Sequence, residues 1–143
     1  MKQKDINVSF GENNIVVFKR CIVILYHIVL KAISIHPTPE LVSLLLGISN
    51  NETISYLLNV KYSKYELCLT LYLANMSNKN LRKFTKTYKT FKDFDYSSIN
   101  HNDIDKLSVE QYSAIFRYLK HIEPFLDIDL TWYQKQYELL FRQ

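Results

Sequence analysis

The chain has 143 residues, of which 48% are hydrophobic and 22% charged, so it can build one continuous core and is too apolar to be disordered. It contains only two glycines and three prolines. That is too few for the frequent turns of a β-sandwich or barrel, and no glycine-rich phosphate loop is present. Composition therefore predicts an all-α fold, a single compact domain over residues 1–143 with about six to seven helices.

The N-terminal part of the sequence is dominated by one apolar stretch. Residues 1–12 are expected to form a tail or a short strand, because Val8 and Phe10 alternate with polar neighbours. Residues 13–35 lack glycine and proline and are apolar on every side, which predicts a central buried helix. A β-branched run inside it leaves a strand possible for part of its length. His27 is expected to be a hydrogen-bonded core residue.

Two short helices are predicted next. Thr38 as N-cap and Pro39 at the first helical position begin the first of them, and Gly47 ends it. Asn50 or Asn51 caps the second. The expected apolar faces are Leu41, Leu44, Leu45 and Ile48 in the first helix and Ile54, Leu57 and Leu58 in the second.

A capping box and a short turn mark the middle of the chain. Ser63 and Glu66 have the Ser-x-x-Glu spacing that opens a helix, here expected to run to about residue 73. Residues 74–76 are a predicted turn, and Ser77 is expected to cap a following helix that ends near residue 90. The polar stretch 91–102 is predicted to be a loop.

The C-terminal part, residues 108–142, is predicted to hold two more helices. Ser108 and Gln111 form a second capping box, and Pro124 ends the helix region that it opens. A last helix is expected from about Asp127. The expected core positions are Val109, Tyr112, Ile115, Phe116 and Leu119, followed by Leu130, Tyr133, Tyr137, Leu140 and Phe141.

Positive charge is concentrated in one segment. The chain carries 18 basic and 14 acidic side chains, a net charge of +4. Residues 61–92 hold eight basic side chains and one acid, Glu66, whereas residues 1–60 are nearly neutral and residues 93–143 are acidic. Such a local excess attracts a polyanion or an acidic partner, although a solvated helix face is the simpler alternative.

On a helix at 100° per residue, residues 78–90 place their basic side chains on one face and their apolar side chains on the opposite face. The apolar arc of about 80° contains Leu81, Phe84, Tyr88 and Phe91. The basic arc of about 120° contains Lys79, Arg82, Lys83, Lys86 and Lys89. Five like charges without an intervening acid repel one another, and an anionic partner would relieve this repulsion.

The two helices within residues 63–90 have the order of a helix-turn-helix, because a tight turn joins them and the second carries the basic face. In that arrangement the second helix enters the major groove of DNA. The candidate base-edge contacts are Asn78, Lys79, Arg82 and Lys83, and the candidate phosphate contacts are Lys86 and Lys89. Residues 41–58 have a similar cadence but almost no basic charge, so two core helices are favoured there.

Residues 54–94 resemble the first helix-turn-helix of the AraC-type transcription regulators, especially the virulence regulators of enteric bacteria. The matching positions are Ile54, Leu57 and Leu58 in the lead-in helix, Leu71-Tyr72-Leu73-Ala74 or Met76-Ser77 at the turn, Leu81-Arg82-Lys83 in the recognition helix and Thr90-Phe91-Lys92-Asp93-Phe94 in the closing motif. The helix at 13–35 is similar to the dimerisation helix of such proteins. The resemblance implies transcription regulation, double-stranded DNA as partner and a homodimer through residues 13–35.

The sequence departs from that family after the first motif. AraC-type domains carry a second helix-turn-helix, and residues 95–143 lack its glycine-containing turn and are acidic. A dimer could supply the second DNA-binding element, or the protein could antagonise a regulator of this type. The competing hypothesis is a helical interaction protein, either a secretion-system accessory or chaperone or a viral Bcl-2-like adaptor, that binds an acidic or apolar protein surface.

Catalytic, metal and cofactor sites find little support in the sequence. His101 with Asp103 and Asp105 shares a loop but has no second cluster beside it, so we expect no enzyme, no metal site and no cofactor. Cys21 and Cys68 lie in apolar runs and are expected to be core residues rather than zinc ligands or a disulfide. With no apolar stretch of about 20 residues and no secretion signal, a reducing cytoplasmic location is expected.

Overall fold

The computed structural model describes residues 9–33, 38–77, 79 and 99–142, and over these it is all-helical with no strand. The predicted fold class, a single compact all-α domain, is confirmed. The helices are α1 (Asn14–Ile33), α2 (Pro39–Leu46), α3 (Asn51–Leu58), α4 (Lys64–Leu73), α6 (Val109–Ile122) and α7 (Thr131–Phe141), with short 3-10 turns at Gly11–Asn13 and Glu123–Phe125. In the described ranges, no helix is long and apolar enough to cross a membrane.

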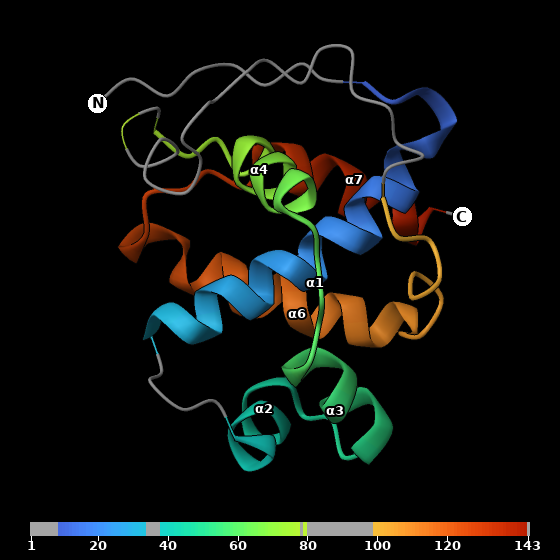
Figure 1. Cartoon of the computed structure of the whole chain (residues 1–143), viewed down its shortest axis with the longest axis vertical. Coiled ribbons are helices and arrows are strands. Elements are labelled where there is room, and N and C mark those ends of the chain that lie inside the picture. Colours follow the sequence, from blue (N-terminus) through green and yellow to red (C-terminus); the bar gives the residue numbers. More distant parts are fainter. Residues whose placement is uncertain (1–8, 34–37, 78, 80–98, 143) are drawn as a thin grey trace.

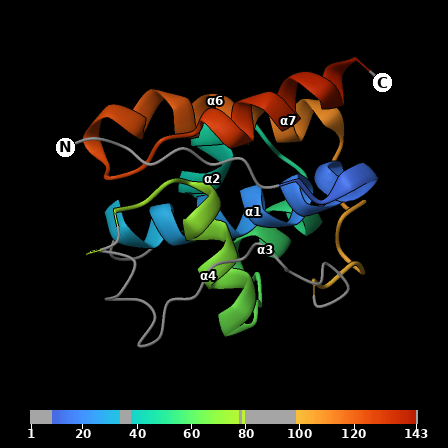
Figure 2. The same cartoon turned by 90° about the horizontal axis from the view of Figure 1, so that it is seen from above.

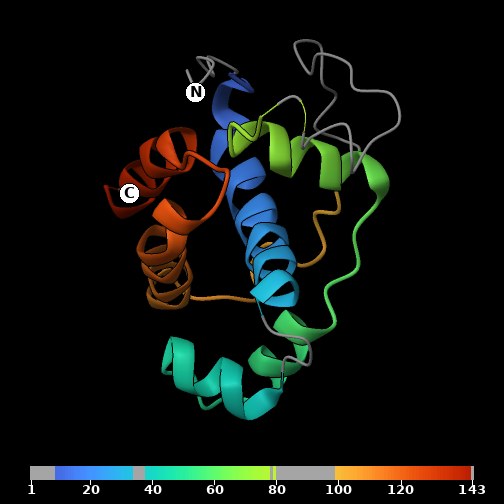
Figure 3. The same ribbon diagram turned by 90° about the vertical axis from the view of Figure 1, so that its left-hand side faces the viewer.

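Helix α1 is the centre of the molecule (Figure 1). It contacts α4 on one side, α6 and α7 on another, and α3 near its C-terminal end. Figure 2 shows α1 between α4 and the α6–α7 pair, and Figure 3 shows α2 and α3 grouped at one end of it. The three neighbouring layers bury α1 on all sides, as its continuous apolar sequence predicted.

The side chains of α1 are almost completely covered within one chain. From Val17 to Tyr26 the buried positions of this helix are at most 1% exposed, and they include the predicted core residue Cys21. Cys68, also predicted to be in the core, is only partly buried, and both thiols are free. The homodimer through residues 13–35 stays a prediction.

The predicted caps of α2 and α3 are present. The Thr38 hydroxyl accepts a hydrogen bond from the Leu41 amide at 3.1 Å, and the Asn50 side chain accepts one from Thr53 at 3.0 Å. Gly47 ends α2 at a φ of 65°, the left-handed conformation that favours glycine. Asn50, rather than Asn51, is therefore the N-cap of α3.

The predicted apolar face of α2 was partly wrong, although Ile48 is buried as predicted. Val42 and Leu46 are the buried residues of this helix, whereas Leu44 is 81% exposed and Leu45 is 36% exposed. Nearly every position of this short helix is apolar, so periodicity does not choose which side meets α6. The tertiary contact with α6 decides the rotation.

The C-terminal region has further differences at element ends. The capping boxes of α4 and α6 are confirmed, with both reciprocal hydrogen bonds in each. Helix α7 begins at Thr131, four residues later than expected, and Phe141 is 51% exposed instead of buried. Val109 is also exposed. At the N-terminus, the described residues from Ser9 onward form a 3-10 turn and not a strand.

His27 is a hydrogen-bonded core residue, as predicted. It is 4% exposed, and its Nδ1 lies 3.1 Å from the Leu57 carbonyl oxygen, to which a neutral ring can donate. The Tyr62 ring packs edge-on against it at 5.9 Å. Burial lowers the pKa of His27, opposed by the hydrogen bond to Leu57 and assisted by the charge of Lys31.

This lowered pKa predicts a loss of stability in mild acid. The unfolded chain binds a proton at His27 near its ordinary pKa of 6.5, whereas the folded chain does so only at lower pH. Stability from this residue is therefore present above pH 6.5 and is lost as the pH falls, with a slope of up to about 1.4 kcal/mol per pH unit. Urea denaturation between pH 8 and pH 5 would measure it, and a His27→Gln variant should lack this component. If the stability of the His27→Gln variant fell with pH as steeply as that of the unaltered chain, the prediction would be contradicted.

Candidate functional site

Most of the predicted DNA-binding residues lie outside the described part of the chain. These are Asn78, Arg82, Lys83, Lys86 and Lys89. Lys79 is described, and it is helical and exposed. The structure therefore informs the first half of the candidate helix-turn-helix, residues 63–77, and the second half stays a prediction.

Helix α4 and its C-terminal turn form a well-anchored start for that motif. The helix ends at Leu73, and Asn75 follows in the left-handed region with a φ of 53°. The Ala74 carbonyl accepts from the Asp129 amide at 2.7 Å, and the Ser77 amide donates to the Asp127 carboxylate at 3.2 Å. Two hydrogen bonds from the α6–α7 connection therefore hold residues 74 and 77, just before the candidate second helix at 78–90 in the sequence.

Within residues 61–92, the described part of the chain exposes cations and no acid. Lys61, Lys64 and Lys79 are all exposed. Glu66, the single acid among residues 61–92, is only 4% exposed and is paired with Arg20. Because that carboxylate is buried and neutralised by α1, it does not screen the lysines from a partner. This is a feature that the charge count alone did not reveal.

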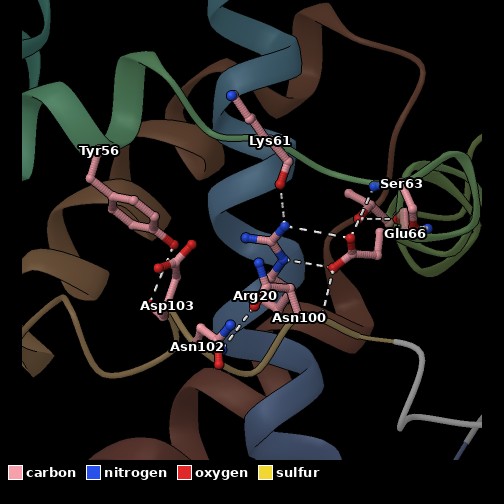
Figure 4. Close-up of polar contacts among 9 residues, drawn as sticks. Arg20, Tyr56, Lys61, Ser63, Glu66, Asn100, Asn102 and Asp103 are labelled. Carbon is pink, nitrogen blue, oxygen red and sulfur yellow. Dashed lines mark hydrogen bonds and ion pairs between the residues drawn. The ribbon is translucent and has the colours of Figure 1, made fainter.

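The Arg20–Glu66 ion pair joins four parts of the chain (Figure 4). Arg20 Nε donates to Glu66 Oε2 at 2.7 Å, and its Nη2 donates to the Lys61 carbonyl. Glu66 also accepts from the Ser63 amide at 3.0 Å, which is half of the capping box, and from the Asn100 amide at 3.2 Å. Helix α1, the segment before α4, α4 itself and the loop at 99–102 therefore meet at one carboxylate.

The electrostatics of this pair favour the charged form of both groups. Burial acts to raise the pKa of Glu66, but the hydrogen bonds and charge of Arg20 and the amides of Ser63 and Asn100 outweigh it, so the pKa is lowered. Burial likewise acts to lower the pKa of Arg20, and Glu66 reverses the effect. Both groups are ionised near neutral pH, and each depends on the other.

A polar cleft of about 980 Å³ lies beside this ion pair, between α3 and the loop after residue 99. Its walls carry amide, hydroxyl and charged side chains together with one aromatic ring. The lining residues are Asn50, Asn51, Glu52, Thr53, Ser55, Tyr56, Asn59, Val60, Lys61, Asn100, Asp103 and Lys106. The sequence did not indicate this cleft, because its walls come from segments about 50 residues apart.

The loop residues considered for catalysis are engaged elsewhere. Asp103 pairs with Lys106 at 3.0 Å, Asp105 lies 3.7 Å from Lys19, and His101 is exposed. Within the described ranges, no group of three or more histidine, cysteine, aspartate or glutamate side chains is placed to hold a metal ion. The loop is therefore held by ion pairs and does not gather these three residues into one cluster.

Comparison with known proteins gives no relative for this chain. No protein-family model matches it, and neither a curated protein nor a solved structure matches it significantly.

Proposed function

We propose that this protein is a non-enzymatic regulatory protein that binds double-stranded DNA, or antagonises a DNA-binding regulator, through the basic segment at 78–90. The observation that supports it is the burial of Glu66 against Arg20, because Glu66 is the one acid within residues 61–92 and the described lysines of that segment are exposed. The turn after α4 adds support, since it is held at Ala74 and Ser77 from the α6–α7 connection. A helix-turn-helix needs such a rigid first helix and turn to aim its second helix.

Charge reversal in the basic segment is the direct test. A Lys83→Glu/Lys86→Glu variant is expected to lose duplex binding at about 50 mM salt, because two phosphate contacts become repulsive. For the unaltered chain, the logarithm of affinity should fall with the logarithm of salt concentration, with a slope near −0.9 per phosphate neutralised. A gel-shift series over salt measures both quantities.

A matched control uses the same charge change on another helix. Lys135 is exposed on α7 and Arg142 is exposed directly after it, and both lie outside residues 61–92. A Lys135→Glu/Arg142→Glu variant should keep most of its DNA affinity at the same net charge. Equal losses in the two variants would indicate a nonspecific charge effect, and absence of duplex binding by the unaltered chain at low salt would exclude direct DNA binding.

One observation favours the second candidate, a helical protein-interaction module. Leu45, which is 36% exposed on α2, lines a hollow of about 320 Å³ between α2 and α6, and a second hollow of about 460 Å³ lies at the C-terminal end of α2. An exposed apolar side chain in such a hollow is typical of a site for a partner helix. A protein partner that binds the Lys83→Glu/Lys86→Glu variant normally but not a Leu45→Asp variant would favour this function over DNA binding.

A further inference from the structure

Helices α2 and α3 form a lobe, residues 38–58, at one end of the molecule (Figure 3). The two helices pack against each other, and a short connection joins Gly47 at the end of α2 to Asn50, the N-cap of α3. Toward the rest of the described chain, α2 packs against α6 and α3 packs against α1. Such a compact pair of neighbouring helices is a unit that can open without the unfolding of the whole chain.

Open space borders both helices of this α2–α3 lobe. The hollows of about 320 and 460 Å³ lie beside α2, and the polar cleft of about 980 Å³ lies between α3 and the loop after residue 99. Side chains that line such spaces lack neighbouring atoms on one side and lose dispersion contacts there. The attachment of the lobe therefore depends on its buried apolar side chains, among them Val42, Ile54 and Leu57, each at most 5% exposed.

The polar contacts that join the α2–α3 lobe to the rest of the described chain come from two neighbouring residues of α3, Tyr56 and Leu57. The Tyr56 hydroxyl donates a long hydrogen bond, 3.4 Å, to the Asp103 carbonyl, and its side chain also faces Arg20 (Figure 4). The Leu57 carbonyl lies 3.1 Å from Nδ1 of His27. This second contact is the shorter and more deeply buried one, so His27 is the principal polar link between α1 and the lobe.

A protonated His27 would be a buried cation without an acid beside it. Lys31 on the same helix adds a like charge, α3 presents the Leu57 carbonyl, and the segment before α4 presents the Tyr62 ring edge-on at 5.9 Å. Burial raises the pKa of Tyr62, so this ring carries no negative charge near neutral pH. In the described part of the chain, no acid acts on His27. A single carbonyl does not repay the loss of hydration of a buried cation, so the charged ring favours an arrangement that admits water.

We propose that the α2–α3 lobe separates from α1 and α6 as one unit, and that protonation of His27 promotes this opening. Because α3 holds the Leu57 carbonyl against the ring, its departure gives the imidazolium access to water. Opening also uncovers Val42, Ile54 and Leu57, so mild acid increases the population of a form with an exposed apolar surface. This device is separate from the basic segment and does not depend on DNA binding.

The test is native-state amide hydrogen exchange of the ¹⁵N-labelled full chain, followed by NMR at low urea concentrations. The amides of α2 and α3 should share one protection factor, about tenfold or more below that of α1 and α6. Their protection should also depend less on urea, because opening of the lobe exposes less surface than global unfolding. Between about pH 7.5 and about pH 5.5, after correction for the intrinsic exchange rate, the protection of the lobe should fall about tenfold, since a released histidine titrates near its ordinary pKa of 6.5.

Two histidine variants make the result specific. His27→Gln keeps a side-chain N–H for the Leu57 carbonyl but cannot be protonated, so the protection of the lobe should no longer change with pH. His121→Gln is the matched control, because His121 is exposed on α6 and lines the hollow of about 320 Å³ beside α2. Its loss should leave the pH dependence of the lobe unchanged.

The proposal is overturned if α2 and α3 have the same protection and the same urea dependence as α1 and α6, because the lobe would then open only when the whole chain unfolds. It is also overturned if the protection of the lobe does not change with pH, or changes equally in His27→Gln. Should His27→Gln fail to fold, which a loss of dispersion in its amide spectrum would reveal, the unaltered chain and His121→Gln still decide the outcome. A pH dependence that disappears in His121→Gln would assign the effect to that residue instead of His27.

Discussion

Replacement of Glu66 by alanine is expected to destabilise the protein by about 3–5 kcal/mol, the usual cost of leaving one member of a buried ion pair without its partner. Arg20 is 1% exposed and, in the described part of the chain, forms an ion pair with Glu66 alone, so its charge would remain buried and uncompensated. The amides of Ser63 and Asn100 would lose their acceptor as well. Because natural domains are stable by only about 5–15 kcal/mol, this loss should be visible as a large fall in the urea midpoint.

A double-mutant cycle separates the cost of the unpaired Arg20 charge from the cost of the hydrogen bonds that Glu66 accepts from backbone amides. An Arg20→Met/Glu66→Leu variant removes both charges and keeps apolar volume, so it should be clearly more stable than Glu66→Ala alone. A double variant that is as unstable as the sum of the single variants would contradict the assignment of Glu66 as the partner that neutralises Arg20. A loss below about 1 kcal/mol in Glu66→Ala would contradict the burial of the pair.

The lowered pKa of Glu66 also predicts that the free energy of unfolding decreases at acidic pH. The pKa of Glu66 is lowered below its ordinary value of 4.5 in the folded chain, so the unfolded chain binds a proton first as the pH falls. The stability that Glu66 contributes is complete above pH 4.5 and decreases as the pH falls through the folded pKa. The loss due to Glu66 begins below pH 4.5, whereas the loss due to His27 begins below pH 6.5, so the His27→Gln variant distinguishes the two residues in one pH series.

Local signals in the sequence predicted local structure well. The caps at Thr38, Ser63 and Ser108 are hydrogen bonds between residues three positions apart, so their partners are visible in the sequence itself. The central burial of α1 was predicted for a similar reason, because a helix that is apolar on all sides has no face to give to water. The end of α2 at Gly47, which has a left-handed conformation, was likewise predicted from the local sequence.

Features that join distant segments could not be predicted in this way. Arg20 and Glu66 are 46 residues apart, and nothing local relates them. The only signal was a cation, Arg20, within a helix predicted to be buried on every side, and a buried charge needs a partner that the local sequence does not identify. The cleft beside α3 could not be predicted for the same reason. One of its walls comes from residues 50–61 and the other from residues 100–106, which are far apart in the sequence. The basic face of 78–90 was a local prediction, and apart from Lys79 it lies outside the described residues.

Truncation of Phe18 to alanine is expected to cost about 3–5 kcal/mol, as is typical for a buried phenylalanine. Phe18 is fully buried on α1, with its ring centroid 6.4 Å from that of Tyr112 on α6 and 6.3 Å from that of Tyr133 on α7. Both tyrosines are held by their hydroxyls, which donate to the carbonyls of Ile104 at 2.6 Å and Thr70 at 2.8 Å. Because these rings are tethered, they cannot move far into the space that the smaller side chain leaves, and a cavity remains.

The matched control is Leu44→Ala, which removes a leucine that helical periodicity assigned to the core. At 81% exposure this side chain has little surface to lose, so the change in unfolding free energy should stay within about 0.5 kcal/mol. Urea denaturation of both variants at one pH compares the two positions directly. A large loss for Leu44→Ala would mean that α2 is rotated toward the face predicted from sequence. A small loss for Phe18→Ala would mean that α6 and α7 do not close over α1, and then the turn that they anchor after α4 would lose its support.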